Sequence, residues 1–194
     1  MTALLIASVL SLHAAFAWGR AQVFRIDGAT PAGVRLIEAA SAVSIAAGTL
    51  LIATRTAPHA LFDPLALLFA TVSAALFAWG VHAVGRLALT AAFSADTPRQ
   101  LLTHGPFRFS RNPFYAAYLL GHAVPMLATR SAWALPALVV MAGIYVAAVR
   151  VEEHKFLASP LAGAWRAYAA HTGRFLPRLK RPVTSATTSI KEFP

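Results

Sequence analysis

Long apolar stretches, each almost free of charge, alternate along this chain with polar connections. Three of them, at residues 1–19, 36–54 and 64–85, have the length of about 20 residues that lets a helix cross a hydrocarbon core about 30 Å thick. Two shorter stretches follow at 113–129 and 132–149, and at about 1.5 Å per residue they reach only about 25 to 27 Å. The pattern predicts an all-α, polytopic membrane protein with five transmembrane or membrane-embedded helices, the last two forming a tight hairpin.

The composition agrees with a membrane protein of one domain. Hydrophobic residues make up 58% of the chain and charged residues only 12%, which is more apolar than a typical soluble domain. We place a single membrane domain at 1–182 and a flexible tail at 183–194, where Ser and Thr replace apolar residues. The chain has no cysteine, so thiolate catalysis and Cys-based metal sites are excluded, and we expect no metal.

Basic residues gather on one side of the predicted membrane. If the N-terminus is outside, all of the 17 Lys and Arg residues except Arg55 and Arg130 fall on the cytoplasmic side. The positive-inside rule expects this bias, which accounts for most of the net charge of +10 without nucleic acid as a partner. We therefore predict a multi-pass protein of the bacterial inner membrane, with its N-terminus outside and its C-terminus cytoplasmic.

The first apolar stretch has one alternative interpretation. Residues 15–17, Ala-Phe-Ala, are similar to the small-residue site at which a signal peptide is cleaved. The stretch lacks the basic region that precedes the apolar run of such a peptide, and its run is long. We therefore expect it to be kept as a membrane span.

A dense polar segment stands immediately before the fourth apolar stretch. Residues 104–115 read H-G-P-F-R-F-S-R-N-P-F-Y, and polar groups beside a membrane helix are costly unless they line a wet or protein-walled cavity. Asn112 and Pro113 suit the N-cap and first position of a helix, whose free amides and dipole attract an anion. The alternative is a capped helix start with arginines and aromatic residues at the level of the headgroups.

A second polar cluster, R-V-E-E-H, follows the fifth apolar stretch. Its Arg150 lies three residues before Glu153, close enough on a helix to pair with it. Residues 162–172 then predict a short cytosolic amphipathic helix that carries Trp165 and Tyr168 and ends at a glycine. The alternative is a helix that lies on the membrane surface with a solvated charged rim.

Taken together, the two clusters resemble the isoprenylcysteine carboxyl methyltransferase family. The resemblance rests on G-P-F-R-F-S-R-N-P-F-Y at 105–115, R-V-E-E at 150–153, G-A-W-R-A-Y at 163–168 and R-F-L-P at 174–177. Their order and approximate spacing agree over residues 99–177, while the first three apolar stretches match only in character. The resemblance implies an integral membrane methyltransferase that uses S-adenosylmethionine and binds it on the cytosolic side.

The same resemblance assigns roles to residues of this chain. The cofactor-binding residues that it implies are Arg99, Gln100, Leu101, Leu102, Gly105, Phe107, Arg111, Asn112, Pro113, Tyr115 and Glu153. Arg150 and Glu153 would be the catalytic pair, and Arg150, Trp165 and Tyr168 would contact the substrate. The family often has histidine where this chain has Asn112, and asparagine cannot act as a general base near neutral pH.

The chemistry tolerates that departure. A sulfonium methyl group is already activated, so its transfer needs positioning and charge placement more than a base. The family name implies the carboxylate of a prenylated cysteine as the acceptor, while a phospholipid amine, a quinone-like phenol or another isoprenoid acid would suit the same architecture. Either way the partners we expect are the bilayer and a lipophilic or prenylated substrate.

Two other classes of function stay open from the sequence. One is an NADPH-dependent, sterol-reductase-like oxidoreductase, and the other is a membrane scaffold without enzymatic activity. A channel or transporter is disfavoured because the spans lack a polar face. His82 and His122 lie within apolar stretches, where each either lines a substrate tunnel or, as we expect, hydrogen-bonds a neighbouring helix.

Overall fold

The computed structural model describes residues 1–26, 28–85, 87 and 89–178, and within them the chain is almost entirely helical. The helices are α1 (Thr2–Val23), α2 (Ala32–Thr54), α3 (Phe62–Val84), α4 (Pro113–Thr129), α5 (Leu135–Leu157) and α6 (Ala162–His171). Single 3-10 turns cover Gly105–Arg108 and Ala132–Ala134. A two-residue parallel pair joins β1 (Phe24–Arg25) to β2 (Leu89–Thr90).

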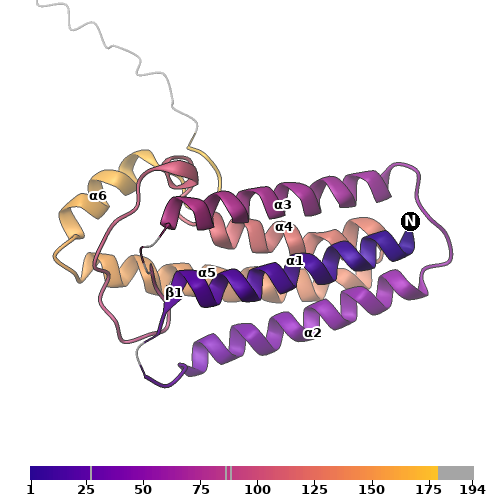
Figure 1. Cartoon of the computed structure of the whole chain (residues 1–194), viewed down its shortest axis with the longest axis horizontal. Coiled ribbons are helices and arrows are strands. Elements are labelled where there is room, and N and C mark those ends of the chain that lie inside the picture. The colour runs from indigo at the N-terminus through magenta and orange to yellow at the C-terminus, as the bar shows by residue number, and fades with distance from the viewer. Residues whose placement is uncertain (27, 86, 88, 179–194) are drawn as a thin grey trace, which may run out of the picture.

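The five long helices run side by side as an elongated bundle, and α6 packs at one of its ends (Figure 1). Helix α4 is central, because it contacts each of α1, α2, α3 and α5. The end of the bundle near α6 also carries β1 and the long connection that leads into α4, whereas the N-terminus lies at the opposite end (Figure 1). The polar segments that the sequence singled out are therefore gathered at one end.

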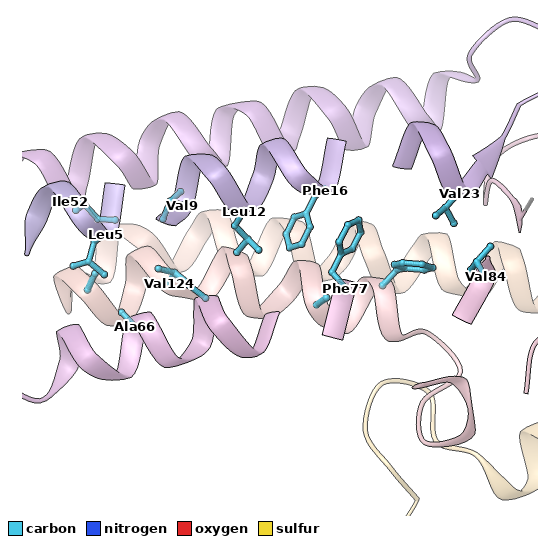
Figure 2. Close-up of a cluster of buried hydrophobic side chains, with 14 of the residues drawn as sticks. Leu5, Val9, Leu12, Phe16, Val23, Ile52, Ala66, Phe77, Val84 and Val124 are labelled. Carbon is cyan, nitrogen blue, oxygen red and sulfur yellow. The ribbon is translucent and has the colours of Figure 1, made fainter. Parts of the chain in front are cut away.

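Apolar side chains of α1 to α4 fill the middle of the bundle (Figure 2). The rings of Phe16 and Phe77 lie 4.8 Å apart between centroids, and Phe77 also meets Phe114 at 5.5 Å. Leu5 and Val9 on α1 are fully buried. Since lipid is as apolar as these side chains, close packing rather than exclusion from water must hold the helices together.

Small residues allow that close packing. A Cβ atom added at Gly80 of α3 would come within 2.8 Å of the Phe114 ring on α4, and one added at Gly48 of α2 within 2.5 Å of Pro125. Pro125 lies inside α4, where its missing N–H is tolerated because neighbouring helices surround that turn. The helices can thus approach each other as small-residue membrane interfaces do.

Four helical segments of the described chain are long and apolar enough to cross a membrane: α1, α2, α3 and Ala132–Leu157. Helix α4 begins and ends where the sequence predicted but has only 17 residues. The predicted count of five spans, and the tight hairpin formed by the last two, therefore stay predictions.

The end of α5 differs from the prediction. We expected the apolar helix to end at residue 149, but it continues to Leu157, so the cluster R-V-E-E-H, for which we expected helical spacing, belongs to the same helix. Charged residues are good helix formers, and nothing in the sequence interrupts the helix before Ser159 and Pro160. The predicted tail at 183–194 lies outside the described residues, as do Arg86 and the basic residues after Arg178, so the domain boundary at 182 stays a prediction.

Candidate active site

A pocket of about 700 Å³, counting its open mouth, lies at the end of the bundle that carries α6; we call it the polar pocket. The connection before α4, the last turns of α5 and one face of α6 meet there (Figure 1). The polar pocket is lined by Phe24, Leu89, Thr90, Pro98, Arg99, Gln100, Leu101, Leu102, Phe107, Arg111, Asn112, Glu152, Glu153, Lys155, Phe156, Trp165 and Tyr168.

Most of the residues that the sequence singled out line this one pocket. They are Arg99, Gln100, Leu101, Leu102, Phe107, Arg111, Asn112, Glu153, Trp165 and Tyr168. Gly105, Pro113, Tyr115 and Arg150 are not among the lining residues. The structure thus brings together segments that are up to about 70 positions apart in the sequence, although the role of each residue stays a proposal.

Glu153 is the most strongly engaged acid of the polar pocket. Arg174 binds its carboxylate with two hydrogen bonds, from Nε at 3.1 Å and from a terminal nitrogen at 2.6 Å, and Arg111 approaches it at 3.3 Å. The hydrogen bond from Arg174 to Glu153 raises the pKa of the guanidinium further above its usual value. Two arginines therefore fix the orientation of this carboxylate at the wall of the pocket.

Arg150 does not take the place that we expected. Among the described residues the carboxylate of Glu153 pairs with Arg111 and Arg174 rather than with Arg150. Arg150 is exposed on α5 and does not line the polar pocket. The predicted pairing of Arg150 with Glu153 was therefore wrong, because packing of α5 turns Glu153 inward and leaves Arg150 on the outer surface.

Residues 172–178 form a strap that contacts three lining residues of the polar pocket, Arg111, Asn112 and Glu153. Its Gly173 carbonyl accepts a hydrogen bond from the Arg111 amide at 2.8 Å, and its Arg174 carbonyl accepts one from Asn112 Nδ2 at 2.9 Å. A Cβ atom at Gly173 would lie only 1.8 Å from the carbonyl oxygen of Leu176, so the strap requires glycine there. The glycine that we expected to end α6 therefore also sets the path of the strap.

Asn112 holds this strap instead of capping α4 with its side chain. It occupies the N-cap position, but no side-chain capping hydrogen bond is made there. Its amide group donates to the Arg174 carbonyl, and its own backbone N–H donates to Ser110 Oγ at 3.2 Å. The predicted N-cap position of Asn112 is confirmed, while its side chain binds the strap rather than the free amides of α4.

Tyr115 lies behind the pocket and reaches it through another acid. Its hydroxyl donates to Glu152 Oε1 at 2.7 Å, and Glu152 lines the polar pocket. The sequence had assigned a role to Glu153 but none to Glu152, although the two carboxylates are adjacent. Adjacent acids on a helix point about 100° apart, so the packing, and not the sequence motif, explains why both of them line the pocket.

Aromatic rings form the opposite wall. Phe156 of α5 stacks on Trp165 of α6 with centroids 4.5 Å apart and rings almost parallel, and the Arg111 guanidinium lies 5.6 Å from the Trp165 ring centroid. Tyr168 donates its hydroxyl to the Phe107 carbonyl, and burial raises the pKa of Tyr168 to about 12. The tyrosine therefore stays neutral near pH 7 and fixes α6 to the turn that carries Phe107.

Three further residues were missed or only partly understood from the sequence. Phe24 comes from β1, and Lys155 donates to the carbonyls of Ala91 and Ser94 at 2.9 and 3.1 Å, which holds the connection before α4 against α5. Phe156 supplies the stacking partner of Trp165. No sequence motif marks these residues, since they reach the pocket only through long-range packing.

Gly105 and Pro113 shape the local backbone instead of lining the pocket. Gly105 has a positive φ of 57°, and a Cβ there would come within 2.8 Å of the Ala83 side chain. It starts the 3-10 turn that places Phe107, and Pro113 starts α4 as predicted. Their effect on the pocket is therefore indirect.

The two histidines of the apolar stretches differ. His122 is buried and lies within hydrogen-bond distance of Ser44 on α2, at 3.0 Å, and of Tyr145 on α5, at 3.2 Å, which is the expected helix–helix contact. His82 is exposed and lines a lipid-facing groove between α1 and α3. Among the described residues, no cluster of three or more His, Cys, Asp or Glu could hold a metal ion.

Comparison with known protein families gives one match. The sequence model of the family described as phospholipid methyltransferase matches residues 64–161, which is about half of the chain. The matched range starts in α3 and ends just before α6, so it includes α4, α5 and the segments that contribute both acids of the polar pocket. No curated protein matches the chain.

Proposed function

Because this chain belongs to the phospholipid methyltransferase family, it is a membrane methyltransferase, and we propose that it uses S-adenosylmethionine to methylate a lipophilic acceptor at the cytosolic face. The observation that supports this most directly is the polar pocket, which joins two carboxylates, arginines and an aromatic wall at one end of a membrane bundle. The basic residues gathered at this end support a cytosolic location, with the N-terminus on the other side.

The residues of the polar pocket fit the chemical groups of this cofactor. A flat adenine and a sulfonium can lie against aromatic faces such as Phe107 and Trp165, where a cation gains about 0.5 to 2 kcal/mol. The zwitterionic amino-acid end has both possible partners nearby, a carboxylate at Glu153 and guanidinium groups at Arg111 and Arg99.

When bound, S-adenosylmethionine supplies an activated methyl group. The acceptor forms its new bond to the methyl carbon as the carbon–sulfur bond breaks, and the electron pair leaves on sulfur. The protein's task is therefore to align the acceptor with this carbon and to exclude water. Glu153, held by two arginines, and the stacked Phe156–Trp165 wall are rigid enough to provide that alignment.

The acceptor that the family resemblance implies is the carboxylate of a prenylated cysteine or of a similar isoprenoid or lipid, giving a methyl ester. This proposal gave Arg150 the task of holding the acidic group. With Arg150 exposed outside the polar pocket, an arginine such as Arg99, which does line it, would have to take that task.

A lipid amine is the second candidate, and the position of Glu152 favours it. This carboxylate lines the polar pocket and accepts the Tyr115 hydroxyl at 2.7 Å. An ammonium group must lose a proton before its nitrogen can be methylated, and Glu152 is the acid placed to attract the cation and to take that proton. A carboxylate acceptor would instead meet this acid as a like charge.

Calorimetry with S-adenosylmethionine on the detergent-purified protein tests the proposal. We expect binding to the wild type and to Arg150→Ala, which serves as the matched control, and loss of binding in Glu153→Ala. A folded wild-type protein that binds no S-adenosylmethionine would refute the proposal, and NADPH would then be tried for the reductase alternative.

The product of methyl transfer separates the two acceptors. Protein incubated with membrane lipids and methyl-labelled cofactor should transfer label to the lipid fraction. Label released as methanol by mild base identifies a methyl ester, and label that survives base identifies an N-methyl group.

A further inference from the structure

One wall of the polar pocket is a segment without regular secondary structure. Residues 98–102 supply five of the lining residues, and residues 96–103 form no helix, strand or turn. An irregular segment has many conformations in solution, and ordering it opposes the binding of a ligand unless the protein has ordered it beforehand. The contacts that hold this wall in place therefore affect how tightly the pocket can bind.

Apolar contacts hold the segment at both of its ends. At the far end, Leu102 is buried in the apolar core of the bundle. At the near end, residues 91–94 form a turn whose Ala92 is buried in an apolar cluster with residues of α5, and whose Phe93 covers Gly33 of α2. Because apolar contacts are not directional, they leave the path of the backbone beyond this turn to be set by polar contacts.

Lys155 of α5 supplies these polar contacts. Its ammonium group donates to the carbonyl oxygens of Ala91 and Ser94, at 2.9 and 3.1 Å, and to Ser94 Oγ at 3.1 Å. An ammonium group has three hydrogens, so these three acceptors use all of its donors. The Ser94 hydroxyl also donates to the Ala91 carbonyl at 3.0 Å and accepts from the Asp96 amide at 3.4 Å. The network thus reaches from α5 to the first residue of the irregular segment.

The place of Lys155 on α5 relates the segment to the acids of the pocket. Glu152 and Glu153 line the polar pocket and precede Lys155 by three and two residues on the same helix. The hydrogen bonds of Lys155 therefore hold residues 98–102 at a fixed position relative to both carboxylates. Lys155 also lines the pocket, but its three donors are occupied, so it acts on a ligand through the segment that it holds.

We propose that Lys155 is a positioning residue, which orders residues 91–102 before the cofactor binds. The inference rests on the proposed function and adds to it a residue that the methyltransferase motifs do not mark. When only a fraction of the molecules has the binding-competent arrangement, the apparent affinity falls by that fraction. Loss of the Lys155 contacts should therefore weaken cofactor binding, without slowing methyl transfer once the cofactor is bound and the segment is in place.

Hydrogen–deuterium exchange of the detergent-purified protein without cofactor tests the first half of this proposal. Lys155→Met keeps a long unbranched side chain but removes the three hydrogen bonds, so the amides of residues 91–102 should exchange faster than in the wild type. Lys155→Arg keeps a cation with several donors and should restore most of the protection. Arg166→Met is the matched control, because Arg166 is exposed on α6 and does not line the polar pocket, and it should exchange as the wild type does.

Calorimetry and turnover on the same variants test the second half. Lys155→Met should bind S-adenosylmethionine about tenfold more weakly, the equivalent of one lost hydrogen bond to a charged group, and Lys155→Arg should recover most of that affinity. With methyl-labelled cofactor and a membrane-lipid extract, KM for the cofactor should rise by the same factor in Lys155→Met. The rate of label transfer at saturating cofactor should stay within about twofold of the wild type, which a general loss of folded protein would not produce.

Two results would overturn the inference. Weaker binding with unchanged exchange of residues 91–102 would mean that Lys155 contacts the cofactor itself, and faster exchange with unchanged affinity would mean that the order of this segment does not matter for binding. If Lys155→Met does not fold, Ser94→Ala removes one of the three acceptors and must still speed the exchange and weaken binding by about two- to fivefold, and wild-type values would count against the proposal.

Failure of the proposed function is read from a different measurement. A folded wild type that binds no S-adenosylmethionine refutes the cofactor, whatever the exchange data show. Unchanged exchange in Lys155→Met refutes the ordering role of Lys155, even where the wild type binds the cofactor.

Discussion

The ion pair at the opposite end of the bundle should control stability without affecting the polar pocket. Arg55 and Asp63 are only 5% and 2% exposed, and two guanidinium nitrogens bind the carboxylate at 2.5 and 2.8 Å. Arg55 also donates to the Ala128 carbonyl and to Thr2 Oγ1, so it joins the ends of α1, α2, α3 and α4. Asp63→Asn keeps the shape of the side chain but leaves a buried guanidinium without its counter-charge.

Removing one partner of a buried pair typically costs about 3 to 5 kcal/mol. For a domain of this size, each kcal/mol shifts the unfolding midpoint by about 2 to 4 °C, so Asp63→Asn should unfold about 6 to 20 °C below the wild type. Circular dichroism of the detergent-purified proteins, heated at one fixed rate, measures this shift. S-adenosylmethionine binding at low temperature should not change, because the pair lies beside Thr2 at the start of α1. The N-terminus is at the end of the bundle opposite α6, and α6 lines the polar pocket (Figure 1).

The double variant Arg55→Met/Asp63→Leu is the matched control, since replacing both charges by apolar side chains removes the uncompensated charge. It should recover most of the lost stability. A midpoint for Asp63→Asn within about 2 °C of the wild type would refute the reasoning, because it would mean that the pair contributes less than about 1 kcal/mol.

Three further predictions concern the polar pocket. Glu153→Gln should weaken S-adenosylmethionine binding, measured by calorimetry, by about 10- to 150-fold, because one hydrogen bond to a charged group is lost. Unchanged affinity would exclude contact between this acid and the cofactor. Gly173→Ala should displace the strap and weaken the same binding, because its Cβ would meet the Leu176 carbonyl at 1.8 Å, whereas Gly163→Ala, with nothing within 4 Å, should bind normally. Burial raises the pKa of Tyr168 to about 12, so its hydroxyl stays protonated between about pH 7 and pH 10. Tyr168→Phe should therefore change the rate of methyl transfer by a constant factor over this range. A difference in the shape of the pH–rate profile between the variant and the wild type would show that Tyr168 titrates there.

The apolar pattern predicted the helices well because membrane length and hydropathy fix them locally. Helix α4 occupies the predicted residues, and α1 to α3 start or end within a few residues of the prediction. The end of α5 could not be predicted in this way. Its last two turns are polar, so hydropathy does not mark them, and the ion pairs of Glu153 and the contacts of Lys155 hold them in place.

The motifs also predicted most of the pocket lining, but not the direction of each side chain. Arg150 and Glu153 are only about 60° apart around the α5 axis, yet one is exposed and the other is bound by two arginines. That difference depends on where α6 and the strap pack, which spacing along the chain does not reveal. Similarly, Arg20 and Glu38 belong to different helices, so only their packing shows that they form one charged site.

Helix α5 connects the two halves of the proposed reaction. Tyr145 lines a cavity between α1 and α2, and Glu152, seven residues or about 10 Å farther along, lines the polar pocket. In the proposed reaction, a cofactor from the cytosol and an acceptor from the membrane would therefore meet within these two turns, near Tyr115 and Glu152. The acceptor must be able to place its reactive atom there while its chain stays between α1 and α2. In the proposed reaction, this requirement would select acceptors by the distance between the reactive atom and the part of the chain that lies between α1 and α2.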